Sequence, residues 1–448
     1  MRADFGWPAI LRLGLVQAAL GAVVVLTTST LNRVMTVELA LPAVLPGGLV
    51  ALHYLVQVLR PRMGHGSDAG GRRTPWIVGG MALLAAGGLG AACATAAMAR
   101  HPVAGIVAAV LSFLMIGIGV SAAGTSLLVL LAQRVAASQR ASAATAVWLM
   151  MIAGFALTAG IAGTLLDPFS PARLVAVSAG VSLCAFMLAC MAMWGLEGAR
   201  PGAEAAPVPA SAPGAAAARF REALAQVWAE PAARRFTLFV FISMLAYSAQ
   251  DLILEPFAGV ALGFTPGEST RLSGTQHGGV LLGMVAAALA GRGTGGRRFG
   301  SLRAWQIGGC LVSAVALLGL VGAGLVGPAW PFKANVFLLG AANGAFSIAA
   351  IAAMMKLAGE GRHSREGVRM GLWGAAQAVA FGLGGLVGTA ASDLARMFIG
   401  SPGLAYAAVF AAEAGLFVVA AALAAKVGRE PSRRPGTLEV GAAGLEAR

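Results

Sequence analysis

The 448-residue sequence is poor in charge: Asp, Glu, Lys and Arg make up only 11% of it. A soluble protein of this length would carry about a quarter charged residues. Hydrophobic residues make up 58% of the chain, and many apolar runs approach the ~20 residues that a helix needs to cross a bilayer. The composition therefore excludes an ordinary soluble domain and predicts an all-α polytopic membrane protein.

Cysteine is also scarce, and the four cysteines lie in apolar runs without the spacing of metal ligands, which favours their interpretation as small hydrophobic residues buried in the bundle: Cys93, Cys184, Cys190 and Cys310. No phosphate-binding glycine loop follows a strand, and no Walker, His-x-x-Glu or Ser/His/Asp pattern is present. We therefore expect no enzyme activity and no metal site. The first apolar run lacks a small-residue cleavage site, so we expect it to be retained.

The apolar runs predict twelve membrane-spanning helices in two groups of six. Their expected limits are Ile10–Val34, Ala40–Leu59, Trp76–Met98, Val103–Leu131, Ala141–Leu165, Leu174–Trp194, Phe236–Val260, Gly274–Ala290, Ala304–Val326, Phe332–Lys356, Met370–Leu394 and Leu404–Val427. An Ala-, Pro- and Gly-rich stretch separates the groups. The chain thus divides into an N-terminal half (1–195), a cytoplasmic linker (196–235), a C-terminal half (236–427) and a cytoplasmic tail (428–448).

The formal net charge of +14 reports orientation in the membrane rather than nucleic-acid binding. Most of the 32 Lys and Arg residues fall in alternate short loops, in the linker and at the two ends of the chain. Cytoplasmic loops carry such an excess of basic residues. The pattern places both termini in the cytoplasm, and it supports an even number of crossings with the lipid bilayer as the protein's environment.

The loop between the second and third predicted helices has the sequence GHGSDAGGRR. It resembles the loop signature of the major facilitator superfamily through Gly64, Asp68, Gly71, Arg72 and Arg73, with Ala69 where a basic residue is usual. A second copy, GRGTGGRRFG, follows the eighth predicted helix and keeps Gly296, Arg297 and Arg298, with Gly293 in the place of Asp68. Two copies at matching positions imply this superfamily's fold of two duplicated six-helix halves.

The composition of this loop motif has a physical rationale. Glycines allow a tight turn between packed helices, and a carboxylate near a helix end can bond backbone donors or pair with arginine. The loop could therefore latch neighbouring helices at the cytoplasmic face. The alternative is a plain polar hairpin with orienting arginines.

Two clusters of polar residues end the first helix of each half. LNRVMTVELALPA contains Asn32, Arg33 and Glu38, and AYSAQDLILEPFAG contains Gln250, Asp251 and Glu255. Ionisable groups inside membrane spans are costly and are candidates for function. The clusters are interpreted as a polar site or an inter-half lock at the non-cytoplasmic end of a central cavity, with ordinary interfacial charge as the alternative. Asp251 and Glu255 share a helix face, so they repel unless a cation, a proton or an arginine lies between them.

Three further residues are weaker candidates. His53, in the second predicted helix, could bind the magnesium of a chlorin ring through a neutral imidazole nitrogen, or it could be a hydrogen-bonded packing residue. His277, which opens the eighth predicted helix, is a lesser candidate for the same role. Glu413 is an isolated acid in the twelfth helix, where it either faces a cavity or pairs with a polar neighbour.

The two polar clusters, together with GVRMGLWGAAQAVAFGLGG (Gly367–Gly385), resemble signatures of the PucC/LhaA proteins, the bacteriochlorophyll delivery family. The resemblance implies a protein of a phototrophic bacterium's inner, intracytoplasmic membrane that supports the assembly of light-harvesting complexes by handling bacteriochlorophyll. Bacteriochlorophyll would be its cargo, and antenna or pigment-biosynthesis proteins would be its partners. One branch is called a bacteriochlorophyll synthase chain, a label that need not mean catalysis. The residues carried over are Asn32, Arg33, Glu38, Gln250, Asp251, Glu255, Pro256, Trp373 and Gln377.

A second function stays open from the sequence. An ordinary secondary transporter of a small apolar solute, driven by protons, would have the same architecture. In that case Asp251, Glu255 or Glu413 would carry the proton.

Overall fold

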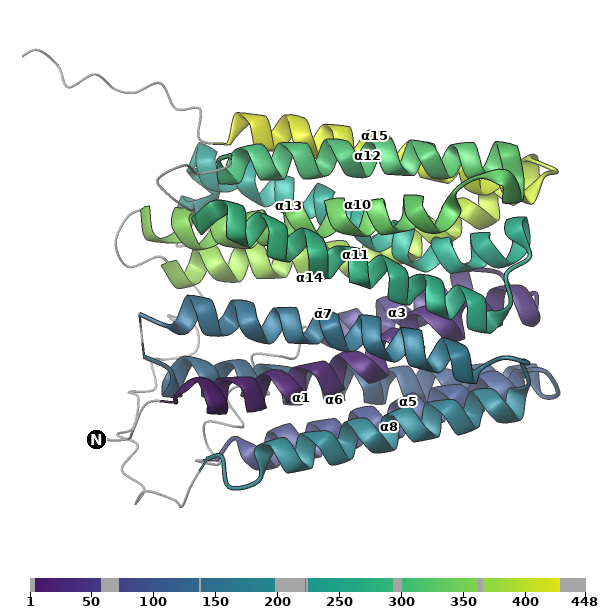
Figure 1. The fold of residues 1–448 in the computed structure, drawn as a ribbon, viewed down its shortest axis with the longest axis horizontal. Coiled ribbons are helices and arrows are strands. Elements are labelled where there is room, and N and C mark those ends of the chain that lie inside the picture. Colours follow the sequence, from purple (N-terminus) through teal and green to yellow (C-terminus); the bar gives the residue numbers. More distant parts are fainter. Residues whose placement is uncertain are drawn as a thin grey trace, which may run out of the picture.

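The computed structural model of the chain describes residues 5–57, 72–136, 138–197, 222, 225–292, 300–360 and 366–427. These residues form a bundle of long helices joined by short loops (Figure 1). The N-terminal half contains a first rod (α1, Trp7–Val25; η1, Leu26–Thr30; α2, Leu31–Arg33; η2, Val34–Glu38), α3 (Val44–Val56), α5 (Thr74–Met98), α6 (Pro102–Arg134), α7 (Arg140–Leu165) and α8 (Pro171–Met193). The C-terminal half contains α10 (Pro231–Leu262), α11 (Pro266–Arg292), α12 (Leu302–Val326), α13 (Phe332–Glu360), α14 (Glu366–Phe398) and α15 (Pro402–Lys426).

Ten of these helices are long and apolar enough to cross a membrane. The other two rods are α3, with 13 residues, and α11, whose first half is polar. The chain is therefore a multi-pass helical membrane protein, and the expected number of twelve crossings is compatible with its structure.

Several predicted limits differ from the observed ones by a few residues, and three of the starts that differ have a local reason. The second helix begins at Val44 rather than Ala40, because the chain is not helical between Leu39 and Pro42, where Ala40 has a positive φ of 49°. The eighth begins at Pro266 rather than Gly274. Thr265 and Glu268 form a capping box, in which the Thr265 amide donates to the Glu268 carboxylate (3.0 Å) and the Glu268 amide donates to the Thr265 hydroxyl (3.1 Å). The seventh begins at Pro231, inside the expected linker, because proline suits the first turn of a helix.

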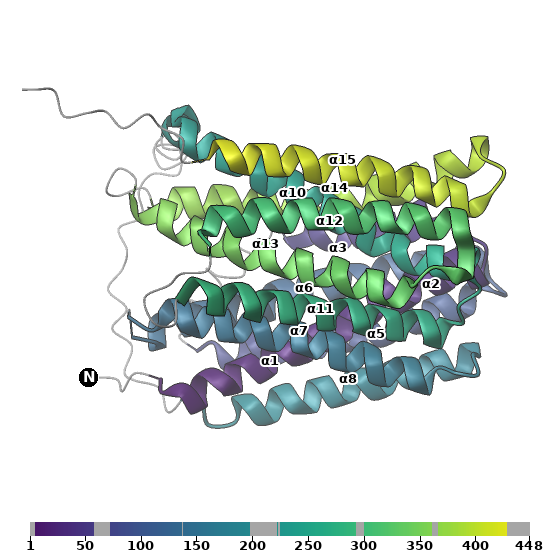
Figure 2. The same ribbon diagram turned by 45° about the horizontal axis from the view of Figure 1, so that its top comes forward.

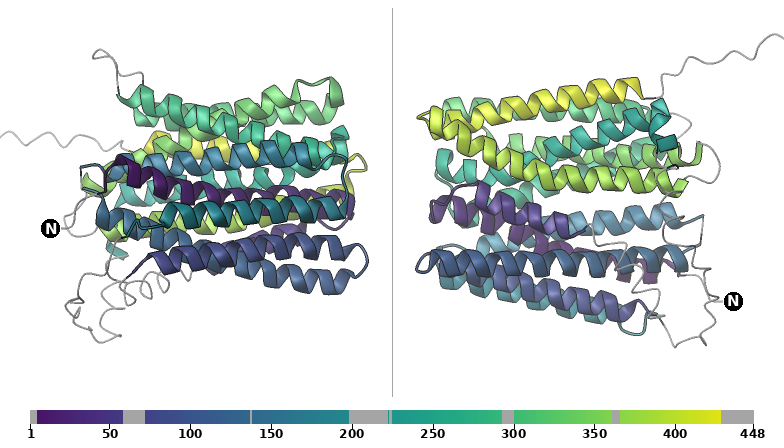
Figure 3. Two further views of the ribbon diagram at one scale, coloured as in Figure 1. Left: turned by 60° about the horizontal axis from the view of Figure 1, so that its bottom comes forward. Right: turned by 180° about the vertical axis from the view of Figure 1, so that it is seen from behind.

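The helices of each half surround their own apolar core. The first core draws on residues between Phe5 and Leu196, joined by Leu252 of α10, and the second on residues between Phe236 and Val427. The halves meet where α7 packs on α11 and α3 packs on α14 (Figures 2 and 3). The first rod also contacts α10 and α11.

The terminal end of the bundle is the one where α1 begins at Trp7 and α15 ends at Lys426, and both lie on the same side of the molecule (Figure 1). The distal end is the opposite one, where the first rod ends at Glu38 and α15 begins at Pro402.

Candidate functional site

The first rod is not a regular helix where its polar residues lie. Two π-helical segments, Leu26–Thr30 and Val34–Glu38, enclose the single turn Leu31–Arg33. A π-turn inserts an extra residue into the helix, and such insertions are frequent at functional sites. Here Ser29 lies on the first π-helical segment, Asn32 and Arg33 lie on the turn between the two segments, and all three are buried at the boundary with the C-terminal half.

Side chains of the first rod bond directly to α10 and α11. The Ser29 hydroxyl donates to the Glu255 carboxylate, and the Asn32 amide nitrogen donates to the Leu252 carbonyl at 2.6 Å. The Thr30 and Thr270 hydroxyls share a hydrogen bond of 3.0 Å. We call this boundary the polar seam. Its predicted members Asn32 and Glu255 lie in it together, whereas the uncharged partners Ser29, Thr30 and Thr270 were missed, because single Ser and Thr residues are common in membrane helices and form no pattern.

Arg33 is the most buried cation of the seam, with 2% of its surface exposed. Its guanidinium pairs with Glu38 and donates to the Phe264 carbonyl, at 2.6 Å, beyond the end of α10. It also lies close enough to Glu255 to act on the charge of that carboxylate. A buried charge is tolerated only when it is paired and hydrogen-bonded, and Arg33 meets this condition through groups of both halves.

Asp251 and Glu255 share a face of α10, as predicted, but they turn to different neighbours. Asp251 accepts a hydrogen bond of 2.8 Å from the Gln276 amide of α11, whereas Glu255 bonds Ser29 of the first rod. A cation, a proton or an arginine could relieve the repulsion between these two acids, and of these an arginine, Arg33, is present near Glu255. Gln250 lies beside Asp251 in the sequence but is fully buried, and neither atom of its amide has a hydrogen-bond partner among the described residues.

Glu413 is a buried acid without a partner in the described part of the chain. It is 3% exposed, and neither carboxylate oxygen accepts a hydrogen bond there. Asp251 is the charged group that acts on it, across the contact between α10 and α15. Glu413 was expected either to face a cavity or to pair with a polar neighbour, and no such pairing is present among the described residues. Trp373 is likewise buried against Phe236, at 4.9 Å between ring centroids, and its indole N–H has no hydrogen-bond partner among the residues that the structure describes.

The two histidine candidates are both in the interior. His53 is 3% exposed, and its ring nitrogen Nε2 lies 3.0 Å from the amide nitrogen Nε2 of Gln57, at hydrogen-bond distance. His277 bonds the Ser273 carbonyl through Nδ1 at 2.8 Å, and its ring meets Phe155 of α7 edge-on. His53 therefore fits the interpretation as a hydrogen-bonded packing residue, and its role as a magnesium ligand stays a prediction.

Three aromatic rings meet beside Asp251, and the sequence analysis missed them. Phe381 of α14 lies 5.6 Å from Tyr54 of α3 and 5.8 Å from Tyr247 of α10, between ring centroids. Tyr247 is one turn before Asp251, and Gln377, a predicted member, is one turn before Phe381. The chain has only 3 tyrosines, and two of them meet here, which was the available signal. We call Tyr54, Tyr247 and Phe381 the aromatic cluster.

Two further acids at the distal end join the halves, and they too were missed. Asp167, which follows α7, accepts from the Gly267 amide (3.2 Å) and the Thr265 hydroxyl (3.2 Å) at the start of α11, and it pairs with Arg271 at 3.4 Å. Asp393 of α14 accepts from the amides of Ala43 (3.0 Å) and Val44 (2.8 Å) at the start of α3. Each acid therefore caps a helix of the opposite half.

The loop motif falls largely outside the described residues. Gly64, Asp68 and Gly71 lie there, as do Gly296, Arg297 and Arg298 of the second copy, so the latch proposed for them stays a prediction. In the described part, the start of α5 is bonded by Glu197, which follows α8. Its carboxylate accepts from the amides of Arg73 (2.7 Å) and Thr74 (2.8 Å) and from the Thr74 hydroxyl (2.6 Å).

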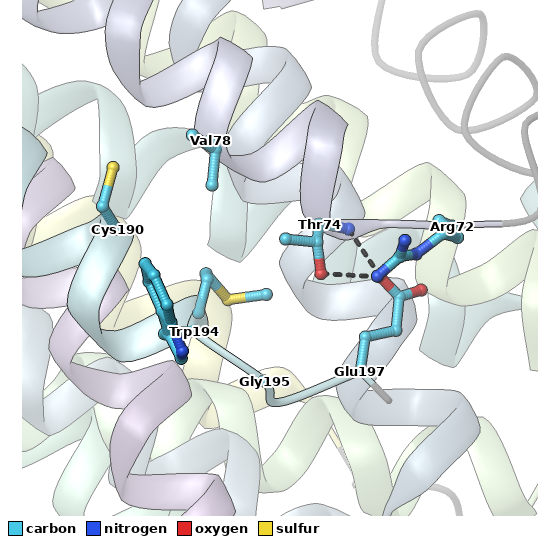
Figure 4. A pocket seen from close by; sticks show the side chains of 8 residues that line it. Arg72, Thr74, Val78, Cys190, Trp194, Gly195 and Glu197 are labelled. Carbon is cyan, nitrogen blue, oxygen red and sulfur yellow. Dashed lines mark hydrogen bonds between the residues drawn. The ribbon is translucent and has the colours of Figure 1, made fainter. Parts of the chain in front are cut away.

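Glu197 and Arg72 line a cavity of about 630 Å³ at the terminal end, whose apolar wall includes Val78, Met193 and Trp194 (Figure 4). Burial raises the pKa of the Glu197 carboxyl. The hydrogen bonds from Thr74 and Arg73, together with the nearby charge of Arg72, lower the pKa by more, so that it lies below its ordinary value. The cavity lies between α5 and α8 of one half, away from the polar seam.

Solved structures with the same arrangement of helices are transporters of the major facilitator type. The D-xylose–proton symporter superposes with a TM-score of 0.72 at 15% identity, covering 94% of this chain and 97% of its own. A bacterial homologue of the human lysosomal transporter Spinster, inward-facing and unoccupied, gives 0.67 at 16% identity, covering 93% and 95%. At these identities the likeness concerns the fold alone, which is that of the major facilitator superfamily.

Sequence comparison places the chain within that fold. Residues 30–431 match the model of the PUCC protein family, and the chain belongs to this family. It is 53% identical over 425 residues to the bacteriochlorophyll synthase 44.5 kDa chain of Rhodobacter capsulatus, covering 94% of this chain and 96% of the relative. It is 31% identical over 439 residues to Protein PucC of Rhodobacter capsulatus, covering 93% and 91%.

Proposed function

We propose that this chain handles bacteriochlorophyll within the membrane and supports its delivery to light-harvesting and photosynthetic complexes, without catalysing a step of pigment synthesis itself. The observation that carries the proposal is the membership of the PUCC family along nearly the whole chain, with a 53% identical relative whose name refers to bacteriochlorophyll. A pigment with a large apolar ring and a long hydrocarbon tail is poorly soluble in water. A membrane-embedded carrier would keep it dispersed.

The interior of the bundle supports this proposal. Ligand sites for such molecules are mostly apolar and have a few placed polar groups. The region around the polar seam has this character, with Asp251 and Gln377 beside the aromatic cluster and small residues around them. In the cell we place the chain in the bacterial inner membrane with the terminal end facing the cytoplasm, because the basic residues concentrate in the loops of that end.

The test is an absorption spectrum of the full chain, purified gently from a phototrophic host. We expect a near-infrared bacteriochlorophyll band to elute with the protein, and we expect a deletion strain to contain less bacteriochlorophyll or fewer antenna complexes. A colourless preparation, together with normal pigment and complexes in the deletion strain, would contradict the proposal. Turnover of a pigment precursor by the purified chain would instead show catalysis.

A second function, proton-coupled transport of a small apolar solute, is favoured by Glu413. Glu413 is a buried carboxyl group with no hydrogen-bond partner among the described residues, it lies inside a membrane span, and Asp251 is a nearby acid, which is the kind of site a proton carrier needs. Flux into liposomes that needs a pH gradient and fails in Glu413→Gln would support it. Gradient-independent behaviour of both wild type and variant would count against it.

A further inference from the structure

We infer that the aromatic cluster of Tyr54, Tyr247 and Phe381 is the platform on which the flat face of a conjugated macrocycle lies. This inference rests on the proposed function and identifies the place in the bundle where the pigment is held. The cluster brings together rings from both halves, because Tyr54 belongs to α3 whereas Tyr247 and Phe381 belong to α10 and α14.

Two of the three rings, those of Tyr54 and Phe381, are incompletely covered, whereas Tyr247 is buried. Near them on α3 and α14, Leu55, Val379 and Leu383 are exposed, with 44 to 66% of their surface open. The Phe381 ring contacts both Tyr54 and Tyr247, so the partly open rings lie where α3, α10 and α14 meet. Protein interiors are close-packed, so partly open rings at an internal boundary leave room for an additional group.

A second aromatic cluster, which lies wholly in the C-terminal half, shows what complete packing looks like. Phe257, Phe332, Tyr406 and Phe410 have ring centroids 5.2 to 5.8 Å apart, the same spacing as the first cluster, but none of them is more than 5% exposed. The two clusters therefore differ in accessibility rather than in chemistry. That difference points to the first cluster as a binding surface, and it makes the second cluster a matched control.

Polar groups are placed on both sides of the platform. Asp251 lies one turn beyond Tyr247 toward the distal end, and Gln377 lies one turn before Phe381 toward the terminal end, each about 6 Å of helix away. A chlorin is flat and apolar on its faces and carries carbonyl groups at its rim. The rings would stack on a face, and an amide or a protonated acid would donate to the rim. A small apolar solute would not need this combination.

The experiment measures pigment binding by the full chain in detergent or nanodiscs. Bacteriochlorophyll is titrated into wild type, Tyr54→Leu, Phe381→Leu, the double variant and the control Phe410→Leu. Binding is followed by the near-infrared band and by the circular dichroism induced in it. Loss of one stacked ring is expected to weaken binding roughly fivefold to tenfold, and the double variant is expected to lose the induced signal. Phe410→Leu should lower the melting temperature and leave the affinity unchanged.

The outcomes separate the two proposals. If wild type binds pigment and the double variant binds it with the same affinity and the same induced signal, the platform is refuted while the proposed function stands. If wild type binds no bacteriochlorophyll under any of these conditions, the proposed function fails. Should the double variant not fold, wild-type affinity and induced signal in both single variants would overturn the platform.

Discussion

At the scale of single residues, the ion pair between Arg33 and Glu38 is strongly asymmetric. Arg33 is 2% exposed and also bonds the Phe264 carbonyl, whereas Glu38 is 34% exposed at the distal end. If the pair is broken, water can solvate the partly exposed Glu38 carboxylate, but it has little access to the buried Arg33 guanidinium. Arg33 is therefore the member on which the structure depends.

Replacing the two partners should show this asymmetry. Arg33→Gln removes a buried cation that serves Glu38, Phe264 and the neighbourhood of Glu255, and we expect a loss of about 3 kcal/mol in the free energy of unfolding. Glu38→Gln should cost less than ~1 kcal/mol, because the carboxylate is partly in solvent. Thermal unfolding in detergent measures both. Equal losses in the two variants would show that the pair does not depend on burial.

The Glu197 cap predicts a pH dependence. Its pKa lies below the ordinary 4.5 in the folded chain, so the folded state binds a proton there less readily than the unfolded state. The stability it contributes is therefore complete above pH 4.5 and is lost as the pH falls below that value through the folded pKa. We expect Glu197→Ala to lower the free energy of unfolding by about 1 kcal/mol at pH 7.

Comparing Glu197→Ala with wild type at different pH values measures this pH dependence. In unfolding curves recorded between pH 7 and pH 3, the difference in stability between wild type and Glu197→Ala should shrink as the medium becomes acidic. A difference that stays constant across this range would rule out the carboxylate as its cause.

The residues of the candidate site were predicted unevenly from the sequence. Arg33, Asp251, Glu255 and Glu413 are identifiable, because an ionisable group in an apolar run is conspicuous. Ser29, Thr270 and Gln276 are not, since the bonds they make depend on which helices become neighbours. Asp167 and Asp393 look like ordinary charges near helix ends until the opposite half is placed against them.

At the scale of helices, α11 and α13 pack through glycines on both sides of the contact. A side chain added at Gly279 or Gly283 of α11 would meet the backbone of α13, and one added at Gly340 or Gly344 of α13 would meet the backbone of α11. Each pair is spaced by four residues, so each lines one helix face. The missing side chains let the two backbones approach closely.

One substitution on each face of α11 tests this contact. Gly283→Val should destabilise the chain by about 3 kcal/mol or prevent folding, because the Ala341 backbone stands where the side chain would go. Gly278→Ala is the matched control, since nothing lies within 4 Å of the added methyl group, and it should be neutral or slightly stabilising. Yields of folded protein and melting temperatures measure both. Tolerance of valine at Gly283 would contradict the close approach.

Most helices were predictable from the sequence to within a few residues, because long apolar runs specify them. The exceptions are α3 and α11. Polar residues occupy the first half of α11, so its start is signalled by the capping box of Thr265 and Glu268 rather than by hydropathy. Prolines shorten α3, and a carboxylate from the other half completes its start.

At the scale of the whole molecule, the contacts described between the halves gather toward the distal end. Asp167 directly follows α7, the fifth helix, and caps α11, the eighth. Asp393 lies in α14, the eleventh helix, and caps α3, the second, so the two acids hold corresponding places in the two six-helix halves. Together with the seam bonds of Ser29 and Arg33, they hold the distal end shut. The repeated loop motif predicted two six-helix halves. It could not predict which end of the bundle is closed, because that depends on how the two halves are placed against each other.

Removing both caps should favour separation at the distal end. We expect Asp167→Ala with Asp393→Ala to weaken the closed arrangement by about 2 kcal/mol, roughly a 30-fold shift in population. Spin labels at Thr164 of α7 and Met397 of α14, both exposed, report the distance between the halves. The mean distance should lengthen in the double variant.

A control for this measurement lies within one half. Glu230→Ala breaks the pair of Glu230 with Arg369, at 2.7 Å, which joins two helices of the C-terminal half. It removes an acid of similar exposure without touching the boundary, so the label distance should stay as in wild type. An unchanged distance in the double variant as well would show that the two caps do not hold the halves together.

The exchange of capping acids also limits how the molecule can be rebuilt. A half expressed alone would have one helix with bare amide groups at its rim, α3 without Asp393 or α11 without Asp167. A chimera joining one half to that of a distant relative would inherit the same defect unless the relative supplied an acid at the matching place. In this bundle, the junction between the halves completes the secondary structure of each.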